Sequence, residues 1–431
     1  MSYIEIEQHY SRTCIICPDI ANKNVGLSID ARLAETIGLA AAINLNIVYQ
    51  EIVKIREIKP SVFLSSGILD RLQPIFKEKE VELLVIDSSL TPIQQRNLEK
   101  KLNLKVIDRT ALILEIFGER AQTKEGKLQV ELAHLTYQRS RLVRSWTHLE
   151  RQRGGAGFLG GPGETQIELD RRIIDDKIIR IKKDLEKVRQ TRQLQRNSRQ
   201  KVPYPVIALV GYTNAGKSSI FNRLSSAGVL AKDLLFATLD NTMRKITLPS
   251  GREVILSDTV GFISNLPHEL IMSFRATLEE VLEADIIVHV RDIANENSNI
   301  QKTDVLSVLK NLGLEDIENK DCYIELLNKI DLLEDIDKSR IEEISKRNER
   351  VICISAHTGE GCNKFLELID KHLSASRKQV NIRIEASNGY LSAWIYRHAE
   401  VLTIMPNEKY LDFSILIEPK DLAKLEKMLN Q

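Results

Sequence analysis

The sequence predicts a multidomain α/β protein, and three observations support this fold class. The chain has 431 residues, which is enough for about two to four domains that each bury a core. Short apolar runs alternate with amphipathic helical stretches before residue 119 and again after residue 200, as in domains with a mainly parallel sheet. The segment between them shows only helical periodicity. We expect four parts: an N-terminal α/β domain (1–118), a basic helical hairpin subdomain (119–200), an α/β domain with a mainly parallel sheet (201–375) and a small C-terminal α+β domain (376–431).

The composition is that of an ordinary soluble protein. Hydrophobic residues make up 43% of the chain and charged residues 28%, which excludes a disordered or collagen-like chain. No run of about 18 apolar residues occurs, so we expect no membrane-spanning helix. The five cysteines form no disulfide framework, and the start of the chain lacks the pattern of a signal peptide. We therefore expect a cytoplasmic protein that is monomeric when free, and a peripheral association with a membrane stays open.

In the N-terminal region, five apolar runs are strand candidates, and the stretches between most of them are helical. Strands are expected at Cys14–Cys17, Ile47–Ile55, Val62–Leu64, Leu83–Asp87 and Lys105–Ile107, and helices near 29–43, 67–79, 91–102 and 110–117. Cys14 and Cys17 have the spacing of half a metal or redox motif. No second cysteine pair accompanies them in the sequence, and both lie in an apolar run, so we expect them in the core.

Residues 119–200 predict two long amphipathic helices. Apolar residues recur at spacings of three, four or seven between Leu128 and Leu149, and a second stripe runs from Ile167 to Val188. Two such stripes are expected to pack as an antiparallel hairpin. The connection between the helices, Gly154–Glu164, contains six glycines.

The net charge of the whole chain, +1, hides an uneven distribution. Residues 119–201 hold 20 Lys and Arg against 11 Asp and Glu, a local net charge of +9, whereas the remainder has a net charge of −8. Basic side chains beside a glycine-rich loop can neutralise RNA phosphates, and an aromatic ring there can stack on a base. A solvated surface hairpin with no binding role is the alternative. The expected RNA contacts are Arg144, Arg151, Arg153, Gly154, Gly155, Gly157, Phe158, Gly160, Gly161, Gly163, Arg171 and Arg172.

A phosphate-binding motif follows the hairpin. The apolar run Val206–Val210 leads into a loop and a helical stretch that match the pattern G-x-x-x-x-G-K-[ST] in its strand–loop–helix context. Backbone N–H groups of such a loop surround phosphates at a helix N-terminus. Lys217 is expected to reach the β- and γ-phosphates, and Ser218 to bind Mg²⁺. The nucleotide contacts expected from this motif are Gly211, Tyr212, Thr213, Asn214, Ala215, Gly216, Lys217, Ser218 and Ser219.

Three later motifs each end an apolar run, at the edge where parallel sheets bind ligands. The first has the pattern D-x-x-G, in which Asp258 can hold Mg²⁺ through a water and the Gly261 amide can sense the γ-phosphate. The second is N-K-x-D, whose final carboxylate accepts hydrogen bonds from guanine N1 and N2; adenine lacks this donor pair. In the third, a backbone amide can reach guanine O6. We expect GTP, with ATP as the remaining alternative. The residues concerned are Asp258, Thr259, Val260, Gly261, Asn328, Lys329, Ile330, Asp331, Ser355, Ala356 and His357.

The group that activates water is not assigned by the sequence. Phe262 occupies the position at which Ras-like switches carry a water-orienting Gln, so we expect slow intrinsic hydrolysis. Several GTPases with Asn at the position of Asn214 bind K⁺ beside the phosphates, so K⁺ is a candidate cofactor beside Mg²⁺. A switch threonine must lie between Lys217 and Asp258. Its candidates are Thr238 and Thr242, which spacing does not separate, and Thr247, which lies in a strand-like run.

The order and the sequences of these segments resemble those of the HflX family of ribosome-associated GTPases. The resemblance extends over residues 1 to about 375, and the glycine loop joined to G-P-G-E-T-Q-I-E is the family's own signature. The segments that carry it are Gly154–Glu164 with its continuation Thr165–Arg172, Gly211–Ser218, Phe236–Asp240, Asp258–Ile263 and Asn328–Asp331.

The resemblance implies a Mg²⁺-dependent P-loop GTPase domain in which Thr238 is the switch threonine and a Mg²⁺ ligand, and Lys217, Asn214 and Thr238 are candidates for transition-state support. It also implies first-switch contacts to the nucleotide from Phe236, Ala237, Thr238, Leu239 and Asp240. The family binds the large ribosomal subunit and its rRNA, and is implicated in splitting stalled or idle 70S ribosomes. The resemblance therefore implies ribosome-stimulated GTP hydrolysis. A GTPase of ribosomal subunit assembly and a regulatory switch with no ribosomal role are the alternatives.

Overall fold

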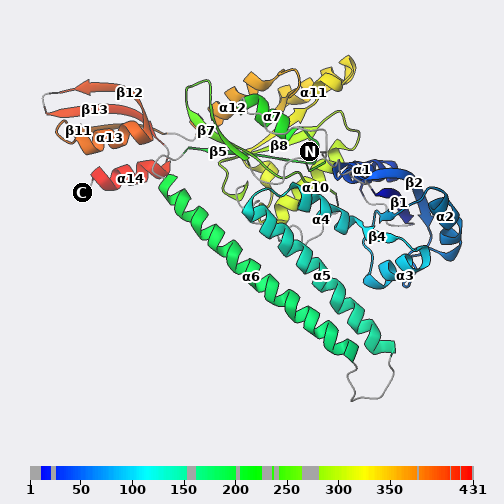
Figure 1. The fold of residues 1–431 in the computed structure, drawn as a ribbon. Helices are drawn as coiled ribbons and strands as arrows, with labels where there is room; N and C mark the ends of the chain where they lie inside the picture. The colour runs from blue at the N-terminus through cyan, green and yellow to red at the C-terminus, as the bar shows by residue number, and fades with distance from the viewer. Residues whose placement is uncertain are drawn as a thin grey trace, which may run out of the picture.

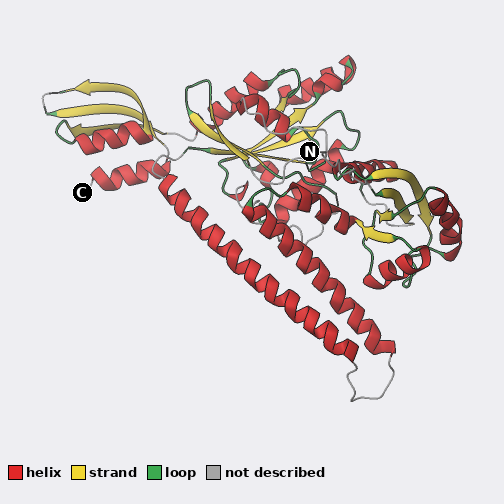
Figure 2. Ribbon diagram, viewed as in Figure 1, coloured by secondary structure: helices red, strands yellow, loops and turns green. Residues whose placement is uncertain are grey.

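The computed structural model describes residues 11–20, 26–152, 162–199, 204–225, 235–236, 242–264, 281–375, 378–407, 409–417 and 419–429. Within these residues the chain forms three β-sheets and a pair of long helices that runs away from them (Figure 1). Helices flank the sheets, and the strands of the two larger sheets alternate with helices along the chain (Figure 2). The predicted multidomain α/β class is confirmed.

The N-terminal domain is built on a four-stranded parallel sheet with the strand order β2-β1-β3-β4. Each strand is followed by a helix, and such crossovers are what parallel neighbours require. The strands are β1 (Arg12–Ile20), β2 (Asn46–Ile55), β3 (Leu83–Ile86) and β4 (Lys105–Asp108). The helices are α1 (Ile29–Ala42), α2 (Ser66–Glu78), α3 (Pro92–Leu102) and α4 (Arg109–Arg120).

The strand prediction for Val62–Leu64 is wrong. Phe63 has a φ of +67° and makes only an isolated bridge with Lys59, so the segment is a turn. Phe63 and Leu64 are nevertheless buried in the core of the N-terminal domain. A short apolar run identifies a buried segment, but its length alone does not distinguish a strand from a turn.

Cys14 and Cys17 are fully buried, as their apolar run predicts. The Cys17 thiol lies 3.5 Å from Oδ2 of Asp87. Burial, and then the Asp87 charge, raise the pKa of the Cys17 thiol to about 12. Because the thiolate is the reactive form, this pair fits a packing role better than a redox role.

The two long helices are α5 (Lys124–Gln152) and α6 (Pro162–Arg199), which lie side by side as an antiparallel hairpin (Figure 1). The side chains buried between them come from the predicted apolar stripes: Leu135, Ile178 and Ile181, flanked by Leu128, Leu132, Ile174 and Leu185. The hairpin prediction is confirmed for the described residues. Neither these nor the other described helices are long and apolar enough to cross a membrane.

The central domain is built on a six-stranded sheet with the strand order β10-β9-β8-β5-β7-β6, in which only β6 is antiparallel to its neighbour. The central strand β5 has its carboxyl end at the edge where such sheets bind ligands. The strands are β5 (Val206–Gly211), β6 (Thr242–Thr247), β7 (Glu253–Asp258), β8 (Ile286–Asp292), β9 (Tyr323–Asn328) and β10 (Val351–Cys353). The helices are α7 (Lys217–Ser225), α10 (Ser298–Asn311), α11 (Asp335–Arg347) and α12 (Cys362–Ala375), with 3-10 turns η1 (Ile317–Asn319) and η2 (Ile330–Leu332).

One apolar core continues from the N-terminal domain into the central domain. Leu39 on α1 and Phe117 on α4 belong to the same buried cluster as Val210 on β5, Phe262 after β7 and Leu309 on α10. A large apolar interface of this kind fixes the relative position of two domains. The carboxyl end of β5 is therefore packed directly against the N-terminal domain.

The C-terminal region, predicted as a small α+β domain, has the element order β-α-β-β-α. Its antiparallel sheet has the strand order β11-β13-β12, and its two helices cover a core that includes Ile395, Phe413 and Leu425. The elements are β11 (Lys378–Glu385), α13 (Gly389–His398), β12 (Ala399–Pro406), β13 (Tyr410–Ile417) and α14 (Pro419–Leu429).

We predict that the substitution Ile178→Ala loosens the α5–α6 hairpin. The Ile178 side chain is 4% exposed, and deleting its outer carbons from a buried interface costs about 2 kcal/mol or more. Hydrogen–deuterium exchange of the amides in α5 and α6 should accelerate. The control is Ile179→Ala on the same helix, because Ile179 is 52% exposed. Equal exchange in the two variants would contradict the packing described here.

Candidate functional site

The predicted phosphate loop connects β5 to α7 through two positions that admit only glycine. Gly216 has a φ of +94°, and a Cβ atom there would lie 2.2 Å from Nδ2 of Asn328. Gly211 has a φ of +156°, and its Cβ would lie 2.2 Å from the carbonyl oxygen of Val290. The loop backbone is therefore held against β8 and against the residue that ends β9.

Lys217 begins α7 and is buried inside this loop. Its ammonium group donates to the carbonyl oxygens of Gly211 at 3.1 Å and Tyr212 at 2.9 Å. Burial lowers the pKa of Lys217 to about 8, although the Asp258 carboxylate opposes that shift. A nearby negative charge offsets the cost of burying a cation, and a nucleotide phosphate can supply that charge. The position of Lys217 suits the predicted contact with a nucleotide phosphate.

The two predicted Mg²⁺-site residues on described elements lie next to each other. The Ser218 hydroxyl, in the first turn of α7, donates to Oδ2 of Asp258 at the end of β7, at 2.6 Å. A hydroxyl and a carboxylate are oxygen ligands of the kind that Mg²⁺ prefers. The third predicted ligand, Thr238, lies outside the described residues. Thr242 and Thr247 both lie in β6, and Thr242 is opposite Asp258 in the register.

The N-K-x-D motif ends β9, and its asparagine braces two loops. Asn328 is almost fully buried; its Nδ2 donates to the carbonyl of Ala215 at 2.8 Å, and its Oδ1 accepts from the Ala356 amide at 3.0 Å. Lys329 has a φ of +68° and forms an ion pair of 2.7 Å with Asp292. The segment Ser355–His357 follows β10, and Asp331 lies exposed in η2. The structure thus brings the predicted base-recognition motifs and the predicted phosphate loop together.

Arg223 is a residue of this site that the sequence motifs do not indicate. It lies on α7 and donates to the carbonyl of Ala356 at 2.6 Å and to that of His357. These contacts hold the segment after β10 against the helix that follows the phosphate loop. In the sequence, Arg223 has only the features of a surface residue on an amphipathic helix, so no local signal identifies it.

Phe262, at the position of the usual glutamine, is a packing residue. Its side chain is buried in the core shared with the N-terminal domain. Its backbone is bonded to the phosphate loop: its N–H donates to the Gly211 carbonyl at 3.1 Å, and its carbonyl accepts from the Thr213 amide at 2.7 Å. The side chain therefore has no group with which to orient a water, as the sequence predicts.

A cleft of about 560 Å³ separates α1 of the N-terminal domain from the phosphate loop. Its walls include Glu35 and Gly38 on α1, Asn214 in the loop and Asp292 at the end of β8. Asn214 is exposed and has a φ of +59°. The N-terminal domain thus borders the side of the loop that carries Asn214, the candidate K⁺ ligand.

The predicted RNA-contacting residues lie partly outside the described residues. This applies to the residues from Arg153 to Gly161. The side chains of Arg144 and Arg151 and the exposure of Gly163 are not described either. Arg171 and Arg172 lie on α6, where their side chains are 51% and 72% exposed. A further arginine of the basic segment, Arg141, faces the N-terminal domain instead, where it forms an ion pair of 3.2 Å with Asp108.

Family models match most of the chain. They describe a GTP-binding GTPase N-terminal region (residues 30–118), its middle region (120–199), a 50S ribosome-binding GTPase (206–329) and an HflX C-terminal domain (340–429). The GTPase HflX of Magnetococcus marinus is 45% identical over 394 residues, which cover 91% of this chain and 90% of that protein. This chain belongs to the HflX family of GTPases.

A second HflX protein and one solved structure are also similar to this chain. The GTPase HflX of Escherichia coli is 43% identical over 338 residues, or 78% of each chain. The crystal structure of a complex of SsGBP with GDP is similar with a TM-score of 0.48 and 22% identity, covering 84% of this chain and 98% of that one. Membership of the HflX family, together with the P-loop GTPase domain, makes this chain a GTP hydrolase.

We predict that Gly216→Ala lowers GDP affinity at least about ten-fold, because its Cβ would displace Asn328 from the phosphate loop and the φ of +94° strains alanine. Titration with a fluorescent GDP measures the affinity.

Gly251→Ala is the matched control for this substitution. Gly251 also has a positive φ, +85°, but its Cβ would meet nothing within 4 Å. This variant should lose some stability and keep its GDP affinity. An equal loss of affinity in both variants would show that backbone strain, and not the contact with Asn328, is responsible.

Proposed function

We propose that this GTPase binds the large ribosomal subunit and uses the GTP cycle to split or rescue stalled or idle ribosomes. The observation that carries the proposal is the α5–α6 hairpin, which extends away from the sheets (Figure 1). It lies in a segment whose net charge is +9, in a chain of net charge +1. A projecting basic element suits a polyanion such as rRNA. The match to the model of a 50S ribosome-binding GTPase supports this partner.

The described arginines of α6 suit phosphate contacts. Arg171 lies 3.9 Å from Asp175, and Arg172 lies 3.2 Å from Glu168, each one helical turn away. Exposed pairs of this kind contribute roughly 0.3–0.5 kcal/mol, so RNA phosphates can replace these carboxylates at little cost. We propose Arg171 and Arg172 as RNA contacts, together with Arg144, Arg151, Arg153 and the glycine loop.

The hairpin is connected to the nucleotide site through the N-terminal domain. Tyr137 on α5 donates to Oδ1 of Asp108 at 2.9 Å, and Arg141 pairs with the other carboxylate oxygen. Asp108 ends β4 in the domain whose core continues into the phosphate-loop region. A nucleotide that favours one arrangement of the switch segments can therefore favour one position of the hairpin.

For hydrolysis, we propose that Mg²⁺ is held by Ser218, by Thr238 and, through a water, by Asp258. Lys217 and the Gly261 amide would contact the terminal phosphates, and Asp331 would recognise guanine. Bound Mg²⁺ neutralises charge on the β- and γ-phosphates. Since Phe262 has no water-orienting group, we expect slow intrinsic turnover and stimulation by the ribosome.

We predict that reversing the charge at Arg151, Arg153, Arg171 and Arg172 lowers ribosome affinity at least roughly 100-fold near physiological salt, because each phosphate contact contributes to the salt-dependent binding. Co-sedimentation with purified 50S subunits measures this affinity. GTP binding should be retained, because all four arginines belong to the segment 119–200 and not to the predicted nucleotide motifs.

The matched control is charge reversal at Arg340 and Arg347 on α11, whose side chains are 75% and 83% exposed. This control should still sediment with 50S subunits. If the hairpin variant also sediments as the wild type does, the proposal that the hairpin binds the ribosome is wrong. Gradient profiles of 70S ribosomes with GTP or a non-hydrolysable analogue then separate splitting, which produces free subunits, from a role in assembly, which leaves 70S particles intact.

We also predict faster GTP turnover in K⁺ than in Na⁺ at equal ionic strength. The exposed Asn214 would place its side-chain oxygen beside the phosphates, where K⁺ supplies positive charge in the transition state. Asn214→Gly should abolish the difference between the salts, because it removes the side-chain oxygen that would bind K⁺. Glycine also keeps the φ of +59° without strain, so the loop should be retained. Equal wild-type rates in the two salts would reject a K⁺ site.

A further inference from the structure

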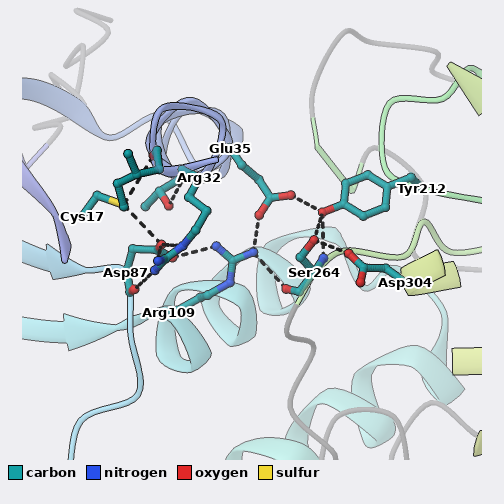
Figure 3. A network of polar contacts seen from close by, with 10 residues as sticks. Cys17, Arg32, Glu35, Asp87, Arg109, Tyr212, Ser264 and Asp304 are labelled. Atoms are coloured by element: carbon teal, nitrogen blue, oxygen red, sulfur yellow. Dashed lines mark hydrogen bonds and ion pairs between the residues drawn. The ribbon is translucent and has the colours of Figure 1, made fainter. Parts of the chain in front are cut away.

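The side chain of Tyr212, in the phosphate loop, joins three segments that are distant in the sequence (Figure 3). Its hydroxyl donates to the Glu35 carboxylate of α1, and it accepts from the backbone N–H of Ser264 at 2.7 Å. The Ser264 hydroxyl also lies 2.7 Å from it and donates to Asp304 on α10 at 2.5 Å. Burial, and then the Glu35 charge, raise the pKa of Tyr212, so its hydroxyl stays protonated as a donor.

The N-terminal domain holds the other side of Ser264 through Arg109, the first residue of α4. The guanidinium of Arg109 donates to the carbonyl oxygen of Ser264 at 3.1 Å. It also pairs with Glu35 and, at 2.7 Å, with Asp87. Glu35 thus contacts both side chains that hold the Ser264 backbone, those of Tyr212 and Arg109. The side chains of Glu35 and Arg109 are 8% and 9% exposed, so these contacts are shielded from competing water.

Ser264 ends a segment that is held tightly against the phosphate loop. Every residue from Asp258 to Ser264 is buried. Phe262 is bonded to the backbone of the phosphate loop through both its N–H and its carbonyl. Ser264 is bonded through the same two groups, but to side chains and not to backbone. Gly261, which directly precedes Phe262, therefore takes its position from hydrogen bonds that partly originate in the N-terminal domain.

The backbone of this segment has a larger task here than in a Ras-like switch. Such switches orient the attacking water with a glutamine side chain, whereas Phe262 is buried in the core and has no group for this purpose. Main-chain amides such as that of Gly261 are what the D-x-x-G segment can offer to the terminal phosphate. A hydrogen-bond donor stabilises a transition state best when it is held in place before the reaction. The precision of the backbone position should therefore affect the rate of hydrolysis.

We propose that Glu35, Arg109 and Tyr212 are positioning residues for GTP hydrolysis. Through Ser264 they hold the backbone of the D-x-x-G segment in the place from which the Gly261 amide contacts the γ-phosphate. This inference rests on the nucleotide site proposed above. In the reaction a water oxygen bonds to the γ-phosphorus, the bond to the β–γ bridging oxygen breaks, and the proton of the water passes to a phosphate oxygen. The three side chains exchange no proton in this step, and the N-terminal domain supplies two of them.

The test measures single-turnover hydrolysis of saturating GTP by the full-length protein with Mg²⁺, and in parallel the Kd of a fluorescent GDP. No ribosomes are added, so the result does not depend on the proposed ribosomal partner. Glu35→Gln removes the charge that pairs with Arg109 and keeps the size of the side chain. The rate should fall at least about five-fold, the effect of one to two lost hydrogen bonds. The Kd of GDP should stay within about two-fold, because GDP lacks the phosphate that Gly261 contacts.

The matched control is Glu51→Gln. Glu51 also accepts from a tyrosine, Tyr49 at 2.8 Å, and from an arginine, Arg71 at 2.6 Å, but on β2 within the N-terminal domain alone. The rate of hydrolysis should not change in this variant.

A second variant, Tyr212→Phe, removes the shared hydroxyl and keeps the ring. It should lower the rate in the same direction as Glu35→Gln, and it keeps the test valid if loss of the Glu35 charge unfolds the protein. The double variant of Glu35 and Tyr212 should lose less than the sum of the two effects in free energy, because both changes act on Ser264.

The outcomes are distinct. A lower rate in Glu35→Gln and Tyr212→Phe, with GDP affinity retained and Glu51→Gln unaffected, supports the inference. An unchanged or higher rate in these two variants overturns it. A loss of GDP affinity that parallels the loss of rate also overturns it, because this is the result of a purely structural role. If the wild-type protein binds no GTP, the proposed nucleotide site is wrong and the inference falls with it.

Discussion

The close approach of Asn328 to the backbone of the phosphate loop is the constraint on which the site depends. Its amide group bonds to Ala215 on one side and to Ala356 on the other, so two segments more than a hundred residues apart take their positions from one side chain. That approach leaves no space for a Cβ at Gly216. The same short loop then directs Lys217 inward and places Ser218 against Asp258. A single buried hydrogen-bonded group thereby fixes the regions predicted to bind phosphate, metal and base relative to one another.

Much of the fold and of this site could be predicted, because the signals are local. Alternation of apolar runs and amphipathic stretches identified the parallel sheets, and the periodicity of Ile174, Ile178 and Ile181 identified the helix pair. The phosphate loop is recognisable because its chemistry needs particular residues at fixed spacing. The wrong strand at Val62–Leu64 has a local cause as well: a turn whose side chains fill a core has the same apolar composition as a short strand.

What the sequence did not indicate depends on contacts between distant segments. Nothing in the local sequence of Glu35, Arg109 or Arg223 distinguishes them from ordinary charged residues of amphipathic helices. Their roles follow only once α1, α4 and α7 are packed against the loops. The same is true of Arg141, which lies in the basic segment 119–201 and forms an ion pair with Asp108 inside the fold. Thr238 and the glycine loop lie outside the described residues, so their roles stay predictions.

The length of the hairpin has a mechanical consequence. Helix α6 contains 38 residues, so it is a stiff rod of about 57 Å. A rod of that length converts a tilt of roughly 5° at its base into a displacement of about 5 Å at its far end, which is close to one helical turn. Under the proposed function, a small rotation at the base of the hairpin would produce a larger displacement at its far end.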